Sequence, residues 1–305
     1  MNSRERFVRN LLFKEADGVT FYEIGFYEEV VNQWYREGLP VYVLFRPAGL
    51  FAYATGKGRM PVGGGINIYE FFDFDSIECL PIDYYPIPRF VERVLEETSR
   101  YRVERDETGM TRKVIKTGYA TVPAYSDWPV KTREEWELIK ERFDPHDPRR
   151  SPSWDSDHAE FYATADFAVG TWMPGIYYMA RWFMGDIRLL TNLYRDPSFV
   201  HEIMDFWTDF LMETVRKFLK ETKVDFVQVT EDMCYNKGLF ISPQQFRDFM
   251  LPNYRKLASF FRSHGVPIFM VDSDGNANEL IPLLIEAGVN VFNPIEVQAG
   301  MDVLE

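Results

Sequence analysis

The chain has 305 residues, 46% of them hydrophobic and 16% aromatic, so it can bury a large core and differs from a disordered protein. Its 47 acidic side chains outnumber its 34 basic ones, and the formal net charge of −13 argues against nucleic acid and anionic membranes as partners. Two cysteines, Cys79 and Cys234, are too few for a disulfide framework, and the N-terminal residues lack an apolar leader. Because no apolar run approaches the length of a membrane span, we expect a soluble, cytoplasmic protein.

The first half of the chain mixes predicted helices, one strand and a hairpin. Its patterning predicts helices over residues 3–14, 26–39 and 131–143, a strand over 18–26 and a β-hairpin over 101–116. Ser3 is expected to be the N-cap of the first helix, because a serine hydroxyl readily accepts a hydrogen bond from the first turn. We interpret residues 1–150 as an N-terminal decoration that also carries the first strand of the main fold.

The second half is more regular. Residues 144–158 form a proline-rich and charged connector, which we interpret as the best boundary in the chain. Beyond it, residues 151–305 alternate between apolar strands and amphipathic helices. The expected strands cover residues 168–173, 225–230, 267–272 and 289–295, and the expected helices cover 185–196, 197–222, 243–265 and 278–288.

This alternation indicates the fold class. Apolar strands that alternate with helices predict a parallel sheet whose outer side is covered by the helices. Polar residues follow the ends of several strands, which favours an α/β fold of the TIM type, a (β/α)8 barrel, over a doubly wound sheet. Roughly six strands can be counted, so we expect the last two βα units of the barrel to be missing from this chain. The two halves are best treated as one domain.

Two aspartates one residue apart follow the strand at 267–272. Alternation would place Asp272 and Asp274 on the same face, where two negative charges about 4 Å apart repel by roughly 4 kcal/mol in a protein-like dielectric. A cation, a shared proton or open solvent must relieve this repulsion. The alternative is that Asp and Asn serve as helix caps and turn residues in such loops, which would account for about half of the polar residues there.

The candidate site consists of the polar residues at the expected strand ends. They are Glu23, Trp172, Glu231, Asp232, Asp272, Asp274, Asn293 and Glu296. Asp272, Glu231 and Asp232 are the candidate catalytic groups, and Glu23, Trp172, Asn293 and Glu296 are candidates for substrate binding. Asp272, Asp274 and Glu231 are also candidate ligands of a divalent metal such as Mg²⁺ or Ca²⁺, because carboxylate oxygens suit hard cations.

A longer pattern runs through residues 195–302. The helix RDPSFVHEIMDFWTDFLMETVRKFL is followed by DFVQVTEDMCYN, by ISPQQFRDFMLPNYRKLASF and by PIFMVDSDGNANELIPLLIEAGVNVFNPIE. In this order of helix, strand and "ISP..F..F..P.Y..L" segment, the chain resembles the uroporphyrinogen decarboxylase (URO-D) superfamily, which also contains the cobalamin-dependent methyltransferases. The resemblance implies a TIM-type barrel with its active site at the C-terminal ends of the strands.

Three functions remain open. The resemblance implies first a methyltransferase that acts on a small methylated substrate and works with a corrinoid carried by a partner protein. Zinc methyltransferases of the superfamily have a His-x-Cys pair where Asp272 and Asp274 stand here, so the resemblance does not imply zinc. The second function is decarboxylation of uroporphyrinogen, which needs no cofactor, and the third is non-catalytic binding of a small cationic ligand. Assembly as a homodimer is a further expectation.

Overall fold

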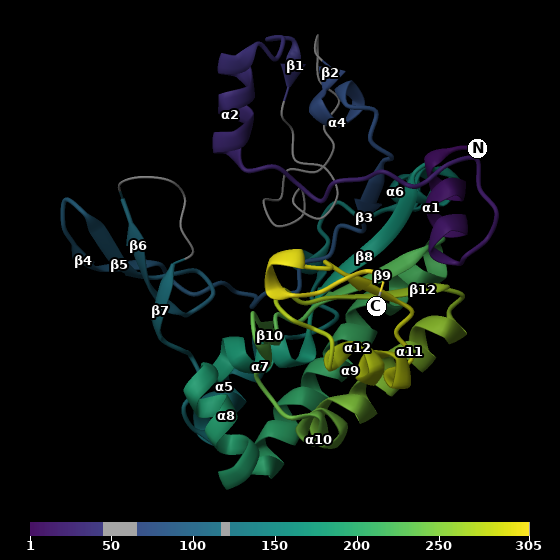
Figure 1. The fold of residues 1–305 in the computed structure, drawn as a ribbon. Helices are drawn as coiled ribbons and strands as arrows, with labels where there is room; N and C mark the ends of the chain where they lie inside the picture. Colours follow the sequence, from purple (N-terminus) through teal and green to yellow (C-terminus); the bar gives the residue numbers. More distant parts are fainter. Residues whose placement is uncertain (45–65, 117–122, 305) are drawn as a thin grey trace.

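A five-stranded parallel sheet forms the centre of the molecule (Figure 1). The computed structural model describes residues 1–44, 66–116 and 123–304. The strands lie in the order β13-β12-β9-β8-β3, and every neighbouring pair is parallel. Their bounds are Ile77–Cys79 (β3), Ala168–Pro174 (β8), Phe226–Thr230 (β9), Ile268–Asp272 (β12) and Val291–Asn293 (β13). These runs are mainly apolar because both faces of the sheet are covered.

Helices cover the outer face of the sheet. Val227, Val229 and Val271 point to this side and belong to one large buried cluster with the helix side chains. The elements of this layer are α6 (Ser156–Thr164), α7 (Ile176–Met184), α8 (Asp186–Arg195), α9 (Pro197–Glu221), α10 (Pro243–Gln245), the π-helical turn η2 (Phe246–Met250), α11 (Leu251–Ser263) and α12 (Leu280–Ala287). The helices predicted from the sequence in this layer are therefore confirmed, whereas α6 and α7 were not predicted.

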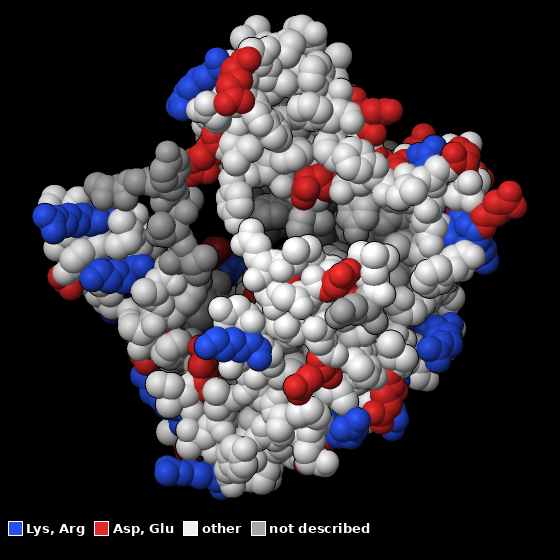
Figure 2. Space-filling model, viewed as in Figure 1, with Lys and Arg blue, Asp and Glu red and all other residues white. Residues whose placement is uncertain are grey.

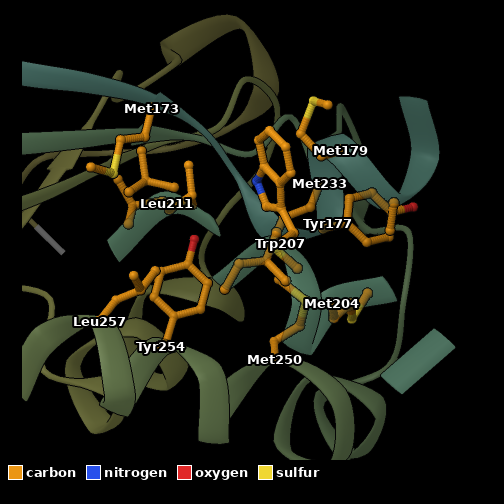
Figure 3. Close-up of a cluster of buried hydrophobic side chains, with 14 of the residues drawn as sticks. Met173, Tyr177, Met179, Met204, Trp207, Leu211, Met233, Met250, Tyr254 and Leu257 are labelled. Carbon is orange, nitrogen blue, oxygen red and sulfur yellow. The ribbon is translucent and has the colours of Figure 1, made fainter. Parts of the chain in front are cut away.

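Methionines fill much of the space between these helices and the sheet. Figure 3 shows Met173 of β8 and Met204 of α9 near Trp207, which lies at the centre of the cluster. The indole N–H of Trp207 donates to the carbonyl oxygen of Pro174 at 2.9 Å, so the one polar atom of this side chain is satisfied. Unbranched methionine side chains adapt to the irregular gaps between a large ring and its neighbours.

Helix α1 (Ser3–Leu11) closes the N-terminal end of the sheet's inner face. Phe7 is fully buried and packs 5.1 Å, centroid to centroid, from the ring of Phe226. Arg4 is also buried and forms an ion pair of 2.8 Å with Asp225. The side chain of Asn2, rather than Ser3 as predicted, caps the helix, because Asn2 is extended and accepts a hydrogen bond from the Glu5 amide.

Two smaller assemblies stand out from the body in Figure 1. One contains α2 (Glu28–Glu37), β1 (Val43–Leu44), β2 (Ile66–Asn67) and α4 (Ile68–Phe71). The other is an antiparallel sheet of β4 (Arg93–Glu97), β5 (Tyr101–Arg105), β6 (Thr111–Ile115) and β7 (Ala124–Asp127), followed by α5 (Arg133–Lys140) and η1 (Pro148–Arg150). The predicted hairpin is β5 and β6, which pair from Tyr101 opposite Ile115 to Arg105 opposite Thr111, so that prediction is confirmed.

The predicted strand at 18–26 is wrong. Its residues form no ladder, and Phe21 instead exchanges hydrogen bonds with Asp75 through the Phe21 amide and carbonyl. The alternating pattern indicated a strand because an extended segment that lies across an apolar surface needs the same alternation. The first strand of the sheet is β3, which is only three residues long and pairs with β8.

The α/β fold with a parallel sheet is confirmed, and closure of a (β/α)8 barrel stays a prediction. Within the described ranges the sheet is open, with β3 and β13 at its edges. Strand β3 precedes the predicted boundary near residue 150 and pairs with β8 beyond it. Arg150 of the connector is buried and donates to the carbonyl oxygens of Asp83 and Tyr85 at 2.8 and 3.0 Å. The two halves of the chain therefore share one sheet.

Charge is distributed over the surface rather than concentrated. Figure 2 shows acidic and basic side chains interspersed on the viewed face, without a continuous basic patch among the residues described. In the same part of the chain, every helix is too short or too polar to serve as a membrane span.

Candidate active site

The inner face of the sheet carries its side chains in layers, because the parallel strands pair in register. The layer nearest the N-terminal ends is Gly170, Phe226 and Ile268, the next is Trp172, Gln228, Met270 and Val291, and the last is Thr230, Asp272 and Asn293. Polarity therefore increases toward the C-terminal ends of the strands. This is the end at which parallel α/β sheets bind their ligands.

Asp272 is the centre of a hydrogen-bond network in the two polar layers. Its Oδ2 atom accepts from Gln228 Nε2 at 2.8 Å and from the Thr230 hydroxyl at 2.7 Å. The Thr230 oxygen in turn accepts from the indole N–H of Trp172 at 2.8 Å. We call Asp272, Thr230, Gln228, Trp172 and the nearby Tyr22 the inner-face site.

Burial raises the pKa of Asp272 to about 6. Hydrogen bonds from Thr230 and Gln228 oppose this shift, and the negative charges of Asp232 and Asp274 add to it. Within the described residues Asp272 has no Lys, Arg or His as an ion-pair partner. A half-buried carboxyl with a pKa near neutrality can accept a cation when ionised and can donate a proton when neutral.

Within the described parts of the chain, two amide oxygens near Asp272 have no hydrogen-bond donor. Gln228 is almost fully buried, and its Oε1 atom is unsatisfied although its Nε2 atom bonds Asp272. Asn293, which pairs with Asp272 across β12 and β13, has an unsatisfied Oδ1 atom. Leaving a buried acceptor unpaired costs about 1–3 kcal/mol of folding free energy. Such a cost is typical of a site that a ligand completes.

Aromatic rings form the walls of the inner-face site. Trp172 is half-buried and packs with the apolar cluster of the inner face, as does Tyr22. Tyr22 is positioned by Phe7, whose ring lies 5.7 Å away, and burial followed by the charges of Glu23 and Asp272 raises its pKa. The polar network around Asp272 therefore borders an apolar and aromatic cluster.

Glu231 has a structural position beside this site. The carboxylate accepts from the amides of Ile176 and Tyr178 at 2.8 and 3.0 Å and from the Tyr254 hydroxyl at 2.6 Å. It thus caps the first turn of α7, whose own N-cap is Gly175 and offers no side chain. Complete burial raises the pKa of Glu231 to about 7, although these hydrogen bonds oppose the shift.

The remaining acidic candidates lie at the rim. The carbonyl oxygen of Asp232 accepts from Arg181 at 2.9 Å, and its carboxylate lies 3.7 Å from the same guanidinium. Asp274 is exposed, and partial burial and the charges of Asp232 and Glu296 raise its pKa. Glu296 accepts a hydrogen bond from the Gly275 amide and so holds the loop that follows β12.

Glu23 is also held by its own loop. Its carboxylate accepts from the amides of Ile24 and Gly25 at 2.8 and 3.3 Å. The structure therefore brings Asp272, Trp172 and Asn293 together on one face of the sheet. It places Glu231, Asp232, Asp274, Glu296 and Glu23 around that face, each with a separate environment.

The predicted metal ligands do not form a metal-binding group. Among the residues that the structure describes, no three His, Cys, Asp or Glu side chains are grouped to hold a metal ion. Glu231 is occupied by three hydrogen-bond donors, and Asp274 is exposed beyond the end of the strand. Asp272 alone is too few for a site of hard oxygen ligands. The described residues therefore offer no set of ligands for a hard metal ion at this site.

Three members of the inner-face site, Gln228, Thr230 and Tyr22, were not identified from the sequence. Gln228 and Thr230 stand at alternating positions of β9, two and four residues past its start, and this parity points both toward the inner face. Two polar residues at this spacing in an otherwise apolar strand are the sequence feature that could have identified them as site residues. Tyr22 was missed because neighbouring residues of a strand point to opposite faces, and in the strand predicted over 18–26 it was Glu23 that was assigned to the site.

Comparison with known proteins agrees with this geometry. Residues 176–297, which hold α7 to α12 and the strands β9, β12 and β13, match the family model "Uroporphyrinogen decarboxylase (URO-D)". A solved structure titled "methyltransferase from Methanosarcina mazei" is similar, with a TM-score of 0.56 and 12% sequence identity, over 96% of this chain and 75% of that one. A search of curated proteins gave no match. The family model thus matches residues 176–297, within the part of the chain whose sequence resembles the uroporphyrinogen decarboxylase superfamily, and the solved structure shares the fold.

Proposed function

We propose that this chain is an enzyme that transfers a methyl group from a small methylated substrate to a corrinoid carried by a partner protein. The single observation that carries the proposal is Asp272, a half-buried carboxyl with no ion-pair partner among the described residues, at the C-terminal end of the sheet. The superfamily match and the similar fold of a methyltransferase support methyl transfer as the class of reaction.

The residues of the inner-face site act on the methyl donor. Asp272 binds and orients it, and when protonated it supplies a proton to the leaving group. Thr230 and Gln228 hold the carboxyl in place through the oxygen that faces them. The corrinoid supplies the acceptor of the methyl group.

The rim of the site offers a surface suited to a flat macrocycle. The hairpin of β10 (Cys234–Tyr235) and β11 (Gly238–Leu239) carries Tyr235, which stacks on Phe240 with 5.3 Å between ring centroids. Both rings are about two-fifths exposed. The hairpin is fixed beside the loop after β12, because the Asn276 amide donates to the Tyr235 carbonyl oxygen at 2.8 Å. An exposed aromatic pair at this position fits the apolar face of a corrin ring.

A spectroscopic assay tests the proposal. The full chain is mixed with a reduced corrinoid and, in turn, with methanol, methylated amines and a methoxy-arene, and methylation of the corrinoid is followed by its visible spectrum. Asp272→Asn should lower the rate by roughly 10²-fold or more, as expected for loss of a general acid. The control Asp274→Asn changes an exposed aspartate two residues away and should leave the rate within about twofold. Activity that is equal in Asp272→Asn and the parent would refute the role of Asp272.

Decarboxylation of a tetrapyrrole is the second candidate, because the matching family model carries the name of that activity. Such a substrate presents many carboxylates, which need cationic partners. The three arginines of α1 are engaged elsewhere, at the opposite end of the sheet from Asp272. Arg4 pairs with Asp225, Arg6 pairs with Asp17 and Asp75, and Arg9 donates to the carbonyl oxygen of Glu15. Incubation with uroporphyrinogen, followed by oxidation and fluorescence detection of the porphyrins, tests this candidate. Loss of carboxyl groups from uroporphyrinogen, in a protein that methylates no corrinoid from any donor, would favour this candidate over methyl transfer.

A further inference from the structure

The inner-face site is rich in hydrogen-bond acceptors. Asp272 has no cationic partner in the described parts of the chain, and Gln228 Oε1 is buried without a donor. The Gln228 amide cannot simply be turned around, because its oxygen would then face the ionised Asp272 carboxylate. Thr230 cannot supply a donor to a ligand, since its hydroxyl hydrogen already goes to Asp272. A ligand that completes this site must therefore bring N–H or O–H groups, and preferably a positive charge.

The surroundings of the acceptors narrow the ligand further. Trp172 and Tyr22 offer ring surfaces beside Asp272, and Met270 faces Gln228 across β12 and β9. A methylated, positively charged nitrogen is attracted to the face of an aromatic ring, and each such contact contributes about 0.5–2 kcal/mol of binding free energy. An ether or ester oxygen would instead add one more acceptor to a site that lacks donors.

We propose that the inner-face site takes a protonated N-methylated amine, whose N–H group bonds Asp272 and Gln228 and whose methyl groups contact Trp172 and Tyr22. The inference rests on the proposed function and names the class of methyl donor for it. The proton that Asp272 supplies to the leaving group in the proposed function is with this donor already on the nitrogen, where the ionised Asp272 holds it. The C–N bond then breaks with its electron pair on nitrogen and a neutral amine leaves. The electron pair of the new bond to carbon comes from the reduced corrinoid.

Quaternary ammonium ions test whether the site recognises the N–H group of the ligand or only its positive charge. Tetramethylammonium has the same charge and more methyl groups than trimethylammonium, but it has no N–H. Loss of one charge-assisted hydrogen bond corresponds to an affinity roughly tenfold to a hundredfold lower. The neutral molecule tert-butanol has a similar size and one donor and lacks the charge. The order of affinity should therefore be trimethylammonium first, tetramethylammonium second and tert-butanol last.

Calorimetry with the full chain tests this order without any catalytic turnover. The parent should bind trimethylammonium at least about tenfold more tightly than tetramethylammonium. Asp272→Asn should weaken trimethylammonium binding by about tenfold or more, and the control Asp274→Asn by less than about twofold. Equal or tighter binding of tetramethylammonium, or an Asp272→Asn variant that binds like the parent, would overturn the proposal. The comparison of ligands on the parent remains decisive even where the variant fails to fold.

The spectroscopic assay then separates this inference from the proposed function. Methylation of the corrinoid from methanol or a methoxy-arene, in a protein that binds no ammonium ion, would overturn the inference and leave methyl transfer standing. Binding of trimethylammonium without methylation from any donor would instead sustain the site and identify a non-catalytic binding protein. A protein that neither binds ammonium ions nor methylates a corrinoid overturns both.

Discussion

Glu231→Gln tests whether the carboxyl beside the inner-face site stabilises the fold rather than takes part in the reaction. The substitution keeps the size of the side chain and removes its ability to ionise. The groups that contact Glu231, the amides of Ile176 and Tyr178 and the Tyr254 hydroxyl, are donors in the structure. In the variant, the NH₂ group of the new glutamine side chain would therefore face one of these donors instead of accepting from it. We expect this mismatch to lower the free energy of unfolding by about 1–3 kcal/mol.

The size of the pH effect follows from the pKa of Glu231. Burial raises this pKa from 4.5 to about 7, which favours the protonated form in the folded state by about 3 kcal/mol. The unfolded chain loses the proton near pH 4.5, whereas the folded chain keeps it to about pH 7. The stability from the protonated carboxyl is therefore complete below pH 4.5 and is lost as the pH rises to 7 and above. Roughly 2.5 kcal/mol of this loss falls between pH 5 and pH 8.

Urea unfolding of the parent and of Glu231→Gln at pH 5, 6, 7 and 8 measures this effect. The parent should lose stability through the carboxyl as the pH rises and the variant should not, so their difference in free energy of unfolding should narrow by roughly 2.5 kcal/mol. Asp272 also titrates in this range, but it is present in both proteins and its contribution cancels in the difference. A difference that stays constant with pH would refute the raised pKa of Glu231. Equal stability at pH 5 would refute its role as a cap.

Two further substitutions test the packing and the polarity of the site. Gly175→Ala should lower the free energy of unfolding by about 3 kcal/mol or more, because the added Cβ overlaps the Glu231 carboxyl and lies 2.5 Å from a backbone carbonyl oxygen. Gly18→Ala, where the added atom meets one neighbour at 4.0 Å, should change it by less than about 1 kcal/mol in the same urea unfolding experiment. Thr230→Val removes a donor to Asp272 and so raises the pKa of that carboxyl further, which should move the pH midpoint of trimethylammonium binding upward by roughly 0.5–1. A uniform loss of affinity with an unmoved midpoint would instead mean that the hydroxyl acts only through packing.

Much of the fold could be predicted because strand and helix patterns were separated by clear turn residues. Strands β8, β9 and β12 are runs of buried residues, and the amphipathic pattern of α9 extends over its whole length. Helix α7 was missed because seven of the nine residues in IYYMARWFM are buried, and so short a run of mainly apolar residues is difficult to assign to a helix or a strand. Strand β3 was missed because three residues are too few to show alternation.

The site could be predicted only in part, because sequence spacing locates a strand end but not the contacts beyond it. Asp272 was found since it ends an apolar strand, and Trp172 and Asn293 follow from the same rule near the ends of β8 and β13. The role of Glu231 depends on the start of α7, which lies 55 residues earlier in the chain for the Ile176 contact. No local pattern contains that information. The rim residues Asp274 and Glu296 belong to loops whose conformation is set by tertiary hydrogen bonds.

Glu231 and Asp272 show how one residue of register separates a structural carboxyl from a chemically useful one. They are adjacent in space, since the Glu231 amide donates to the Asp272 carbonyl oxygen at 3.0 Å. Thr230 is the last inner-facing residue of β9, so Glu231 falls on the outer side, where α7 begins without a side-chain cap. Asp272 pairs with Thr230 and shares its inward direction. Side chains alternate between the two faces of a strand, so a carboxyl faces the site only if it is an even number of positions from an inner-facing residue. This alternation, rather than the distance from the strand end, is therefore the sequence feature that separates the two carboxyls.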